Sequence, residues 1–426
     1  MELIVNPQKE QWSALCRRAS AENSVIEERV AAILERIRKG GDAALREITE
    51  EIDGCAPASF LVSEEEIREA ASQVSESLKS AVEAAAANIR TFHAAQMPKP
   101  LEVETIPGVK CRRRSLPIEK VGLYIPGGSA PLFSTLLMLA IPARLAGCRE
   151  VILSTPCGKD GRVAPAILYA ASVCGVDRIY KAGGAQAIGA MAYGTETIPR
   201  VSKIFGPGNR YVTFAKQAVS ARGVAIDMPA GPSEVMVLAD ESAKAGFVAA
   251  DLLSQAEHGP DSQAMLVASS LAFAEEVREE VERQLALLPR GAIAAKALEN
   301  SRLTVIEERD RMIEFANCYA AEHLIISLRD PWEAAEKITA AGSVFIGNYS
   351  PESAGDYASG TNHTLPTMGL AAAFSGIGLD SFMHSITYQE LSREGLGSLS
   401  NTIITMAEAE GLDAHAAAVR YRIGND

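Results

Sequence analysis

The sequence predicts an α/β protein with two lobes, each built on a parallel sheet that helices cover on both faces. Three observations lead to this prediction: apolar runs alternate with alanine-rich helical stretches, each run is continuously apolar, and the intervals between runs are long enough for helical crossovers. A length of 426 residues is sufficient for two or three domains with complete cores. The runs expected to form strands are 121–125, 150–154, 178–180, 201–205, 235–238, 264–267 and 343–346.

Both ends of the chain are expected to be helical. Apolar residues recur at helical spacing over 25–39 and stop at two glycines, which favour a helix end. Ser63 followed by Glu66 predicts a capping box that opens a helix over 64–92. Near the other end, residues 401–422 are expected to form one or two helices.

The composition argues against several classes of protein. Lysine and arginine number 41 against 54 aspartates and glutamates, and the net charge of −13 disfavours binding to the phosphates of nucleic acids. The most apolar stretch, 131–147, is interrupted by Pro142 and Arg144 and falls short of the roughly 18 apolar residues of a membrane span. No secretory signal is evident, so a cytoplasmic location is expected. Seven cysteines without a Cys-x-x-Cys pair indicate reduced thiols.

Glycine-rich turns follow three of the predicted strands, at 125–128, 182–186 and 205–209. Such turns allow the backbone to approach a nucleotide phosphate. None of them matches the Gly-x-Gly-x-x-Gly fingerprint or a P-loop, so ordinary tight turns remain the alternative.

A metal site is one interpretation of the polar residues around the end of a predicted helix. Gln255 and His258 are three residues apart, so both side chains project from one helix face and could bind one ion. Asp356 and His415, in polar segments after the sheets, are the candidates for further ligands. Two nitrogen and two oxygen ligands suit zinc, although manganese or cobalt would also be compatible. The alternative is a polar helix end without a metal.

An acid and base pair is predicted where a strand-like segment meets a loop, at Glu322 and His323. A carboxyl group with a raised pKa beside a neutral imidazole could exchange protons with a substrate near neutral pH. A buried histidine bonded to the backbone, beside an exposed glutamate, would give the same sequence.

Six motifs together resemble the histidinol dehydrogenase family, and the likeness is strongest over 112–422. They are Val-Gly-Leu-Tyr-Ile-Pro-Gly-Gly at 121–128, Gly-Pro-Gly-Asn-Arg-Tyr-Val at 206–212, Asp-Met-Pro-Ala-Gly-Pro-Ser-Glu at 227–234, Asp-Leu-Leu-Ser-Gln-Ala-Glu-His-Gly at 251–259, Ala-Glu-His-Leu at 321–324 and Gly-Asp-Tyr-Ala-Ser-Gly-Thr-Asn-His at 355–363. The resemblance implies a zinc-dependent oxidation of L-histidinol through L-histidinal to L-histidine, with two NAD molecules reduced.

The resemblance also implies a role for individual residues of this chain. Glu322 and His323 would be the acid/base pair, with Glu322 activating water and His323 taking the proton of the alcohol and later of the hydrate. One zinc ion per subunit would be bound by Gln255, His258, Asp356 and His415. The substrate would contact Ser233, Gln255, His258, His323, Asp356, His363, Glu410 and His415, and NAD would contact Tyr124, Gln186 and Asn209.

The family fold implies two incomplete Rossmann-like lobes of the aldehyde dehydrogenase kind, one inserted in the other, with small helical segments at both ends. The expected division is an N-terminal helical segment at 1–20, a first lobe at 21–124 and 233–377, a second lobe at 125–232, and a C-terminal helical segment at 378–426. The C-terminal segment is expected to be exchanged in an intertwined homodimer, so that His415 would serve the site of the neighbouring subunit.

Two other functions remain open at this level. One is an aldehyde dehydrogenase-like reaction through a thioester on Cys111, Cys148 or Cys157, although the sequence near these cysteines offers no base. The other is a two-lobed protein that binds zinc or another ligand without catalysis, or a family member that has lost its activity. The adjacent Glu322 and His323 disfavour an inactive family member.

Overall fold

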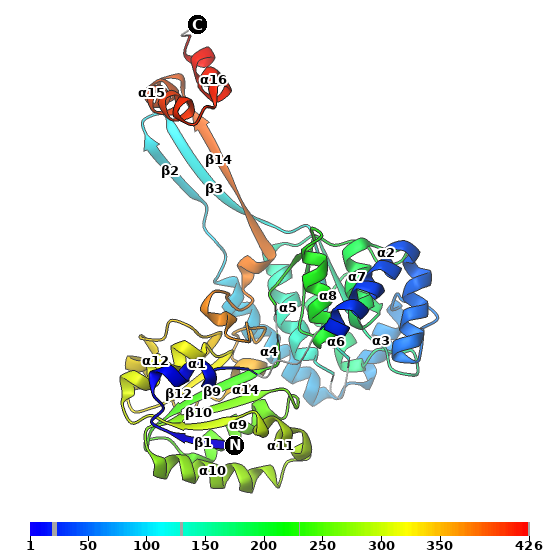
Figure 1. Cartoon of the computed structure of the whole chain (residues 1–426). Helices are drawn as coiled ribbons and strands as arrows, with labels where there is room; N and C mark the ends of the chain where they lie inside the picture. Colours follow the sequence, from blue (N-terminus) through cyan, green and yellow to red (C-terminus); the bar gives the residue numbers. More distant parts are fainter. Residues whose placement is uncertain (19–23, 128–130, 230, 425–426) are drawn as a thin grey trace.

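The computed structural model describes residues 1–18, 24–127, 131–229 and 231–424, which form two lobes and a long arm (Figure 1). Each lobe contains a parallel sheet between two layers of helices, so the predicted α/β class is confirmed. Within these ranges, we find no helix with both the length and the apolar character needed to cross a membrane.

The first lobe is built on a six-stranded sheet. Its strands are β1 (Glu2–Val5), β9 (Glu234–Ala239), β10 (Gln263–Ala268), β11 (Arg302–Val305), β12 (His323–Ser327) and β13 (Ser343–Ile346), and its helices are α1 (Trp12–Leu15), α9 (Ala245–Ala256), α10 (Leu271–Leu285), α11 (Gly291–Glu299), α12 (Arg309–Tyr319), α13 (Pro331–Ala335) and α14 (Glu352–Tyr357). The strand order is β1-β11-β10-β9-β12-β13, and every pair is parallel. Alternate residues of β9 face opposite cores, because Val235 and Val237 pack with α9–α11 whereas Met236 and Leu238 pack with α1, α12 and α13.

The second lobe is built on a five-stranded sheet in the order β6-β5-β4-β7-β8, also parallel throughout. Its strands are β4 (Lys120–Tyr124), β5 (Glu150–Thr155), β6 (Arg178–Lys181), β7 (Lys203–Phe205) and β8 (Ala225–Ile226), and its helices are α2 (Ser24–Asp53), α3 (Glu64–Gln73), α4 (Glu76–Ala94), α5 (Phe133–Ala146), α6 (Pro165–Cys174), α7 (Gly184–Tyr193) and α8 (Arg210–Ser220). Helices α3–α6 cover one face of this sheet, and α2, α7 and α8 cover the other.

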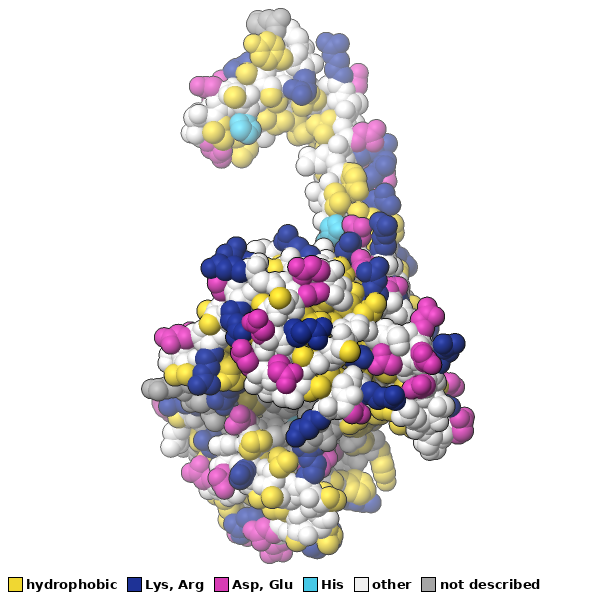
Figure 2. Space-filling model, turned by 90° about the vertical axis from the view of Figure 1, so that its right-hand side faces the viewer, with side chains coloured by type: hydrophobic (Ala, Val, Ile, Leu, Met, Phe, Trp, Pro, Cys, Tyr) yellow, Lys and Arg dark blue, Asp and Glu magenta, His cyan; other side chains and the backbone are white. Residues whose placement is uncertain are grey.

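A three-stranded antiparallel sheet forms the arm, which projects from the lobes and carries two helices at its far end (Figure 1). The strands are β2 (Leu101–Ile106), β3 (Val109–Pro117) and β14 (Met383–Leu391), and the helices are α15 (Arg393–Ala409) and α16 (Asp413–Ile423). Most residues of β2 and β14 are exposed. Figure 2 shows apolar side chains along the arm and around its helical end, a surface that a folded monomer would ordinarily bury.

The expected domain boundaries differ from the observed lobes. Strand β4 pairs with β5 and β7, and helices α2–α4 pack on the helices of the second lobe, so residues 24–94 and 120–124 do not belong to the first lobe. The N-terminal segment is not only helical, because β1 joins the first sheet, and residues 378–426 include the strand β14. The boundary expected at residues 20 and 21 lies outside the described residues. One lobe is nevertheless inserted in the other, since the second lobe lies between β1 and β9 along the chain.

The predicted helix signals are confirmed in part. Ser63 and Glu66 form the capping box at the start of α3, but the segment predicted as one helix over 64–92 is two, because Ser75 caps a new helix by accepting a hydrogen bond from the Leu78 backbone N. Helix α2 consists of two helical segments that meet at Gly41, whose backbone is not helical and has a φ of 52°, so the predicted stop at the two glycines is confirmed and a second segment follows it directly.

Candidate functional site

Seven of the predicted site residues meet between the two lobes, at a cavity of about 150 Å³. The first lobe presents the amino ends of its strands, since Glu234 begins β9 and His323 begins β12. The second lobe presents the carboxyl end of its sheet, where Gly206 follows β7 and Asp227 follows β8. The residues around the cavity include Ser134, Thr135, Gly206, Asp227, Ser233, Gln255, His258, Glu322, His323, Asp356 and His363.

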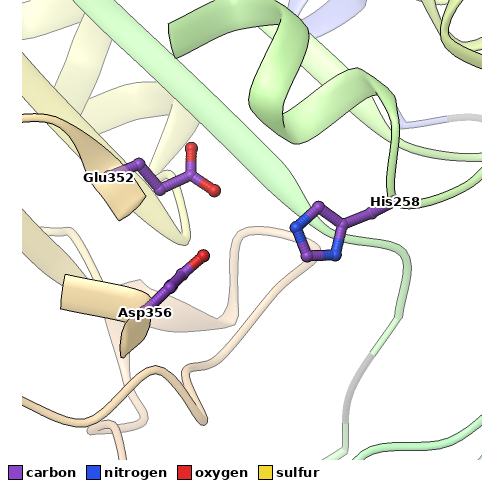
Figure 3. Close-up of side chains that lie close together, drawn as sticks. All are labelled: His258, Glu352 and Asp356. Carbon is purple, nitrogen blue, oxygen red and sulfur yellow. The ribbon is translucent and has the colours of Figure 1, made fainter. Parts of the chain in front are cut away.

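Three side chains of the first lobe converge on a point where one ion could be held. His258, Glu352 and Asp356 each offer a ligand atom, and these atoms lie within 4.8 Å of one another. Figure 3 shows the imidazole of His258, beyond the end of α9, directed toward the two carboxylates. Glu352 and Asp356 are four residues apart on α14, so they share one helix face.

Gln255 belongs to the same cluster and is buried. With its amide nitrogen oriented to satisfy its hydrogen bonds, it donates to both carboxylate oxygens of Glu352, the longer of these bonds measuring 3.1 Å. This orientation leaves the amide oxygen of Gln255 available as a ligand. The structure therefore brings together three of the four predicted ligands, Gln255, His258 and Asp356, and adds Glu352.

The charges of the cluster fit a bound divalent cation. Burial raises the pKa of Glu352 well above its usual value and that of Glu322 to about 8. Burial lowers the pKa of His323, but Glu352, Glu322 and Asp356 outweigh this effect and raise it to about 10. In the described part of the chain, the only ion pairs of these carboxylates are with His323. A divalent cation would favour the ionised carboxylates and the neutral imidazole and so would lower these pKa values, and imidazole with oxygen ligands suits zinc.

Glu322 and His323 are both buried at the edge of the cavity. The Glu322 carboxylate accepts a hydrogen bond from the backbone N of Glu234 at 2.8 Å, and His323 Nδ1 lies 3.3 Å from the carbonyl oxygen of the same residue. His323 Nε2 is 3.5 Å from Asp356 Oδ1 and has no hydrogen-bond partner among the described residues. The two side chains therefore lie where they could contact a group in the cavity, and the raised pKa of Glu322 agrees with the expectation from the sequence, whereas the raised pKa of His323 differs from the neutral imidazole that was expected.

His363 connects the two lobes across the cavity. Its Nε2 lies 3.0 Å from Thr135 Oγ1 on α5, and its Nδ1 lies 2.8 Å from the backbone oxygen of Asp356. Ser233, immediately before β9, also lines the cavity. Both predicted substrate contacts are thus in a position to touch a bound molecule.

Two predicted residues are not brought to the cavity within this chain. His415 is an exposed residue of α16, and Glu410 is the exposed residue that caps α15. Both helices lie at the far end of the arm (Figure 1). A site that uses these side chains would have to obtain them from another copy of the chain.

The predicted NAD contacts lie at the carboxyl edge of the second sheet. Tyr124 ends β4 and accepts a hydrogen bond from the Gly184 backbone N at 3.0 Å, and Asn209 caps α8. Gln186 on α7 donates to Asp53 at 3.3 Å, whereas its own side-chain oxygen is buried without a partner in the described structure. A cavity of about 610 Å³ opens at this edge, and its lining includes Asp53, Gly127, Thr155 and Pro156. Its size and the N-terminus of α6 at its wall fit a dinucleotide. Tyr124, Gln186 and Asn209 do not line this cavity, although Gln186 contacts it through Asp53.

The alternative cysteine nucleophiles are not near the Glu322 and His323 pair. Cys111 lies on strand β3 of the arm, and Cys157 lines the larger cavity. Cys148 is buried, and burial raises its pKa to about 11. This arrangement disfavours thiolate chemistry on any of the three.

Sequence reasoning missed two residues of the site, Glu352 and Glu234. The signal for Glu352 was its position four residues before Asp356, which places both on one face if the segment is helical. Glu234 adjoins Ser233 within a recognised motif, but nothing in the sequence indicated that its backbone would contact both Glu322 and His323.

Comparison with known proteins identifies close relatives of this chain. A sequence model for histidinol dehydrogenase matches residues 16–423. The histidinol dehydrogenase of Bacteroides thetaiotaomicron is 55% identical over 423 residues, covering 99% of both chains, and that of Vibrio cholerae is 53% identical over 416 residues, covering 97% of this chain and 96% of the relative. The crystal structure of histidinol dehydrogenase from Elizabethkingia anophelis superimposes with a TM-score of 0.98 at 50% identity, covering 100% of this chain and 98% of that one.

The hydrogen bonds between Glu352 and Gln255 predict that Glu352→Gln weakens zinc binding by about ten- to a hundredfold, because Glu352 orients the Gln255 amide. Zinc retained per chain after equilibration with graded chelator concentrations measures the effect. Glu257→Gln is the matched control, because it removes a carboxylate beside His258 from outside the cluster. Equal zinc affinity of Glu352→Gln and the wild type would contradict this role.

Proposed function

This chain belongs to the histidinol dehydrogenase family, and on that basis we propose that the cavity between the lobes is the site where histidinol is bound and oxidised. The chain is an NAD-dependent oxidoreductase of the final step of histidine biosynthesis, in a zinc-dependent family. The observation that carries the assignment of the site is the convergence of His258, Glu352 and Asp356 beside the buried Glu322 and His323.

Gln255, His258 and Asp356 are the proposed zinc ligands from this chain. Glu352 orients the side-chain amide of Gln255 by accepting its hydrogen bonds. Zinc bound there would supply a Lewis acid that the nitrogen atoms of histidinol could coordinate. Ser233 and His363 line the cavity and are the proposed further contacts of the substrate. Binding at several points fixes the reacting carbon, which is the main requirement for two successive hydride transfers from the same atom.

His323 is the proposed base for the alcohol proton and, in the second step, for the proton of the hydrate. Its Nε2 has no hydrogen-bond partner among the described residues, while Nδ1 faces the backbone oxygen of Glu234. Glu322 is the proposed base for the water that adds to the aldehyde, since its carboxylate is buried at the same edge of the cavity. The cavity lined by Asp53, which Gln186 contacts, is the proposed site of NAD, which would supply the hydride acceptor when bound.

An intertwined homodimer is the proposed assembly. Its support is the arm, whose exposed apolar residues include Ile386, Tyr388, Met406, Leu412 and Tyr421. Covering them with a second copy would bury apolar surface and would bring the His415 and Glu410 of one chain toward the cavity of the other. His415 is then the fourth zinc ligand and Glu410 a substrate contact.

The proposed roles separate the two oxidation steps. Glu322→Gln is expected to impair oxidation of L-histidinal more than oxidation of L-histidinol, because only the second step needs activated water. His323→Asn is expected to slow both, and each loss is about a hundred- to ten-thousandfold. Turnover is measured from each substrate separately, at matched pH and zinc, with a chelator-treated wild type as the inactive reference. Equal slowing of both steps by Glu322→Gln would refute its role, as would an unslowed His323→Asn.

Exchange of the arm predicts that two inactive variants restore each other. In a mixed dimer of His415→Ala and His258→Ala chains, one site receives both intact histidines and the other receives neither. Equal mixing makes half of the dimers mixed, so recovery of about a quarter of wild-type turnover is expected. Each variant alone is the control. If mixed dimers form, as detected by mass spectrometry of differently tagged chains, and turnover does not recover, the shared site is wrong.

A further inference from the structure

A buried ion pair lies behind the Glu322 and His323 pair, outside the substrate cavity. Arg18 Nε and Nη2 donate to the two carboxylate oxygens of Glu234 at 3.0 and 2.8 Å. The side chain of Arg18 is 10% exposed and that of Glu234 is 1% exposed. Such a two-point contact fixes the relative orientation of both groups, which a single hydrogen bond does not.

The remaining donors of Arg18 bind two further segments. Its Nη1 donates to the backbone oxygen of Cys16 at 3.0 Å, and Nη2 also donates to the backbone oxygen of Tyr319 at 2.6 Å. The guanidinium lies over the Tyr319 ring, 3.8 Å from its centre. Arg18 therefore holds the end of α12 as well as the start of β9.

Glu234 also contacts several other residues, through both its carboxylate and its backbone. Its Oε1 accepts a hydrogen bond from the Met368 backbone N at 2.7 Å, in a turn where Met368 has a φ of 59°. Its own backbone N donates to Glu322 at 2.8 Å, and its carbonyl oxygen faces Nδ1 of His323 at 3.3 Å. A shift of Glu234 would therefore move both of the groups that exchange protons with the substrate.

We propose that Arg18 is a positioning residue for oxidation, acting through Glu234 and Tyr319 on Glu322 and His323. Arg18 contacts both segments that adjoin Glu322 and His323. Glu234 begins the strand that pairs with β12, and Tyr319 precedes Glu322 by three residues. A buried ion pair contributes little net stability after desolvation, so the fixed geometry is the more important consequence. The inference rests on the proposed roles of Glu322 and His323.

Arg302 provides a matched control from the same region. Its Nη1 donates to the backbone oxygen of Leu15 at 2.8 Å, so it anchors the same N-terminal segment. Its Nε lies 3.5 Å from the Glu2 carboxylate, at the edge of the first sheet. Arg302→Ala therefore loosens this segment without removing the contacts of Arg18 with Glu234 or Tyr319.

The experiment compares Arg18→Ala, Arg18→Lys and Arg302→Ala with the wild type, measuring kcat and KM for L-histidinol, zinc per chain and Tm. In Arg18→Ala we expect kcat to fall by about ten- to a hundredfold while KM and zinc content stay within about twofold, because ligands and substrate contacts remain while the reacting groups move. Arg18→Lys keeps the positive charge but cannot donate to both carboxylate oxygens of Glu234 as the planar guanidinium does, so its kcat should lie between those of Arg18→Ala and the wild type. Arg302→Ala should lower Tm and leave kcat within about twofold of the wild type, since the contacts of Arg18 persist.

Guanidinium ion tests the geometry directly. Added to Arg18→Ala, it can occupy the space beside Glu234, and we expect kcat to rise at least about fivefold, with no rise in Arg302→Ala. If Arg18→Ala does not fold, Arg18→Lys and Glu234→Gln take its place, both with reduced kcat and unchanged KM. The proposal would be overturned if the Arg18 variants kept the wild-type kcat, or if Arg302→Ala lost as much kcat as Arg18→Ala. It would also be overturned if guanidinium did not raise the kcat of Arg18→Ala. An inactive wild type would instead refute the proposed function.

Discussion

Two buried carboxylates and one half-buried carboxylate surround one imidazole between the two lobes, and the rest of the site depends on how their charge is compensated. Glu322, Glu352 and Asp356 all lie within 3.9 Å of a ring nitrogen of His323. Burying several like charges is costly unless opposite charge is held among them. The same carboxylates raise the pKa of His323, which must be neutral to accept a proton. A divalent cation beside His258 meets both requirements at once.

The fold supplies the side chains for this arrangement from distant parts of the sequence. The amino ends of β9 and β12 carry Glu234 and His323, and α14 carries Glu352 and Asp356. Because the second lobe is inserted between β1 and β9, the carboxyl edge of its sheet can face these groups from the other side. His363 connects the two lobes through Thr135. The cavity is therefore a product of the insertion and belongs to neither lobe alone.

The sequence predicted elements and side-chain chemistry better than connectivity. Continuous apolar runs located strands such as β5 and β10, and Ser63 with Glu66 located a helix start, because these signals are local. The sheet that each strand joins depends on distant pairing, so residues 120–124 were assigned to the wrong lobe. Strand β14 was missed because most of its side chains are exposed. The motifs identified Gln255, His258 and Asp356 as members of one site. They did not identify Glu234, because its backbone N and O make the contacts with Glu322 and His323, and sequence patterns do not reveal backbone contacts.

The position of zinc in a crystal of the metal-loaded protein, located by anomalous scattering at the zinc edge, tests the account most directly. We expect one ion per chain, with Gln255, His258 and Asp356 of one chain and His415 of a second copy at about 2.0–2.3 Å. Glu352 should remain hydrogen bonded to Gln255, outside the bonding distance of the metal. An ion bound away from His323, or held by the side chains of a single chain with His415 remote, would contradict both the proposed ligand set and the exchange of the arm.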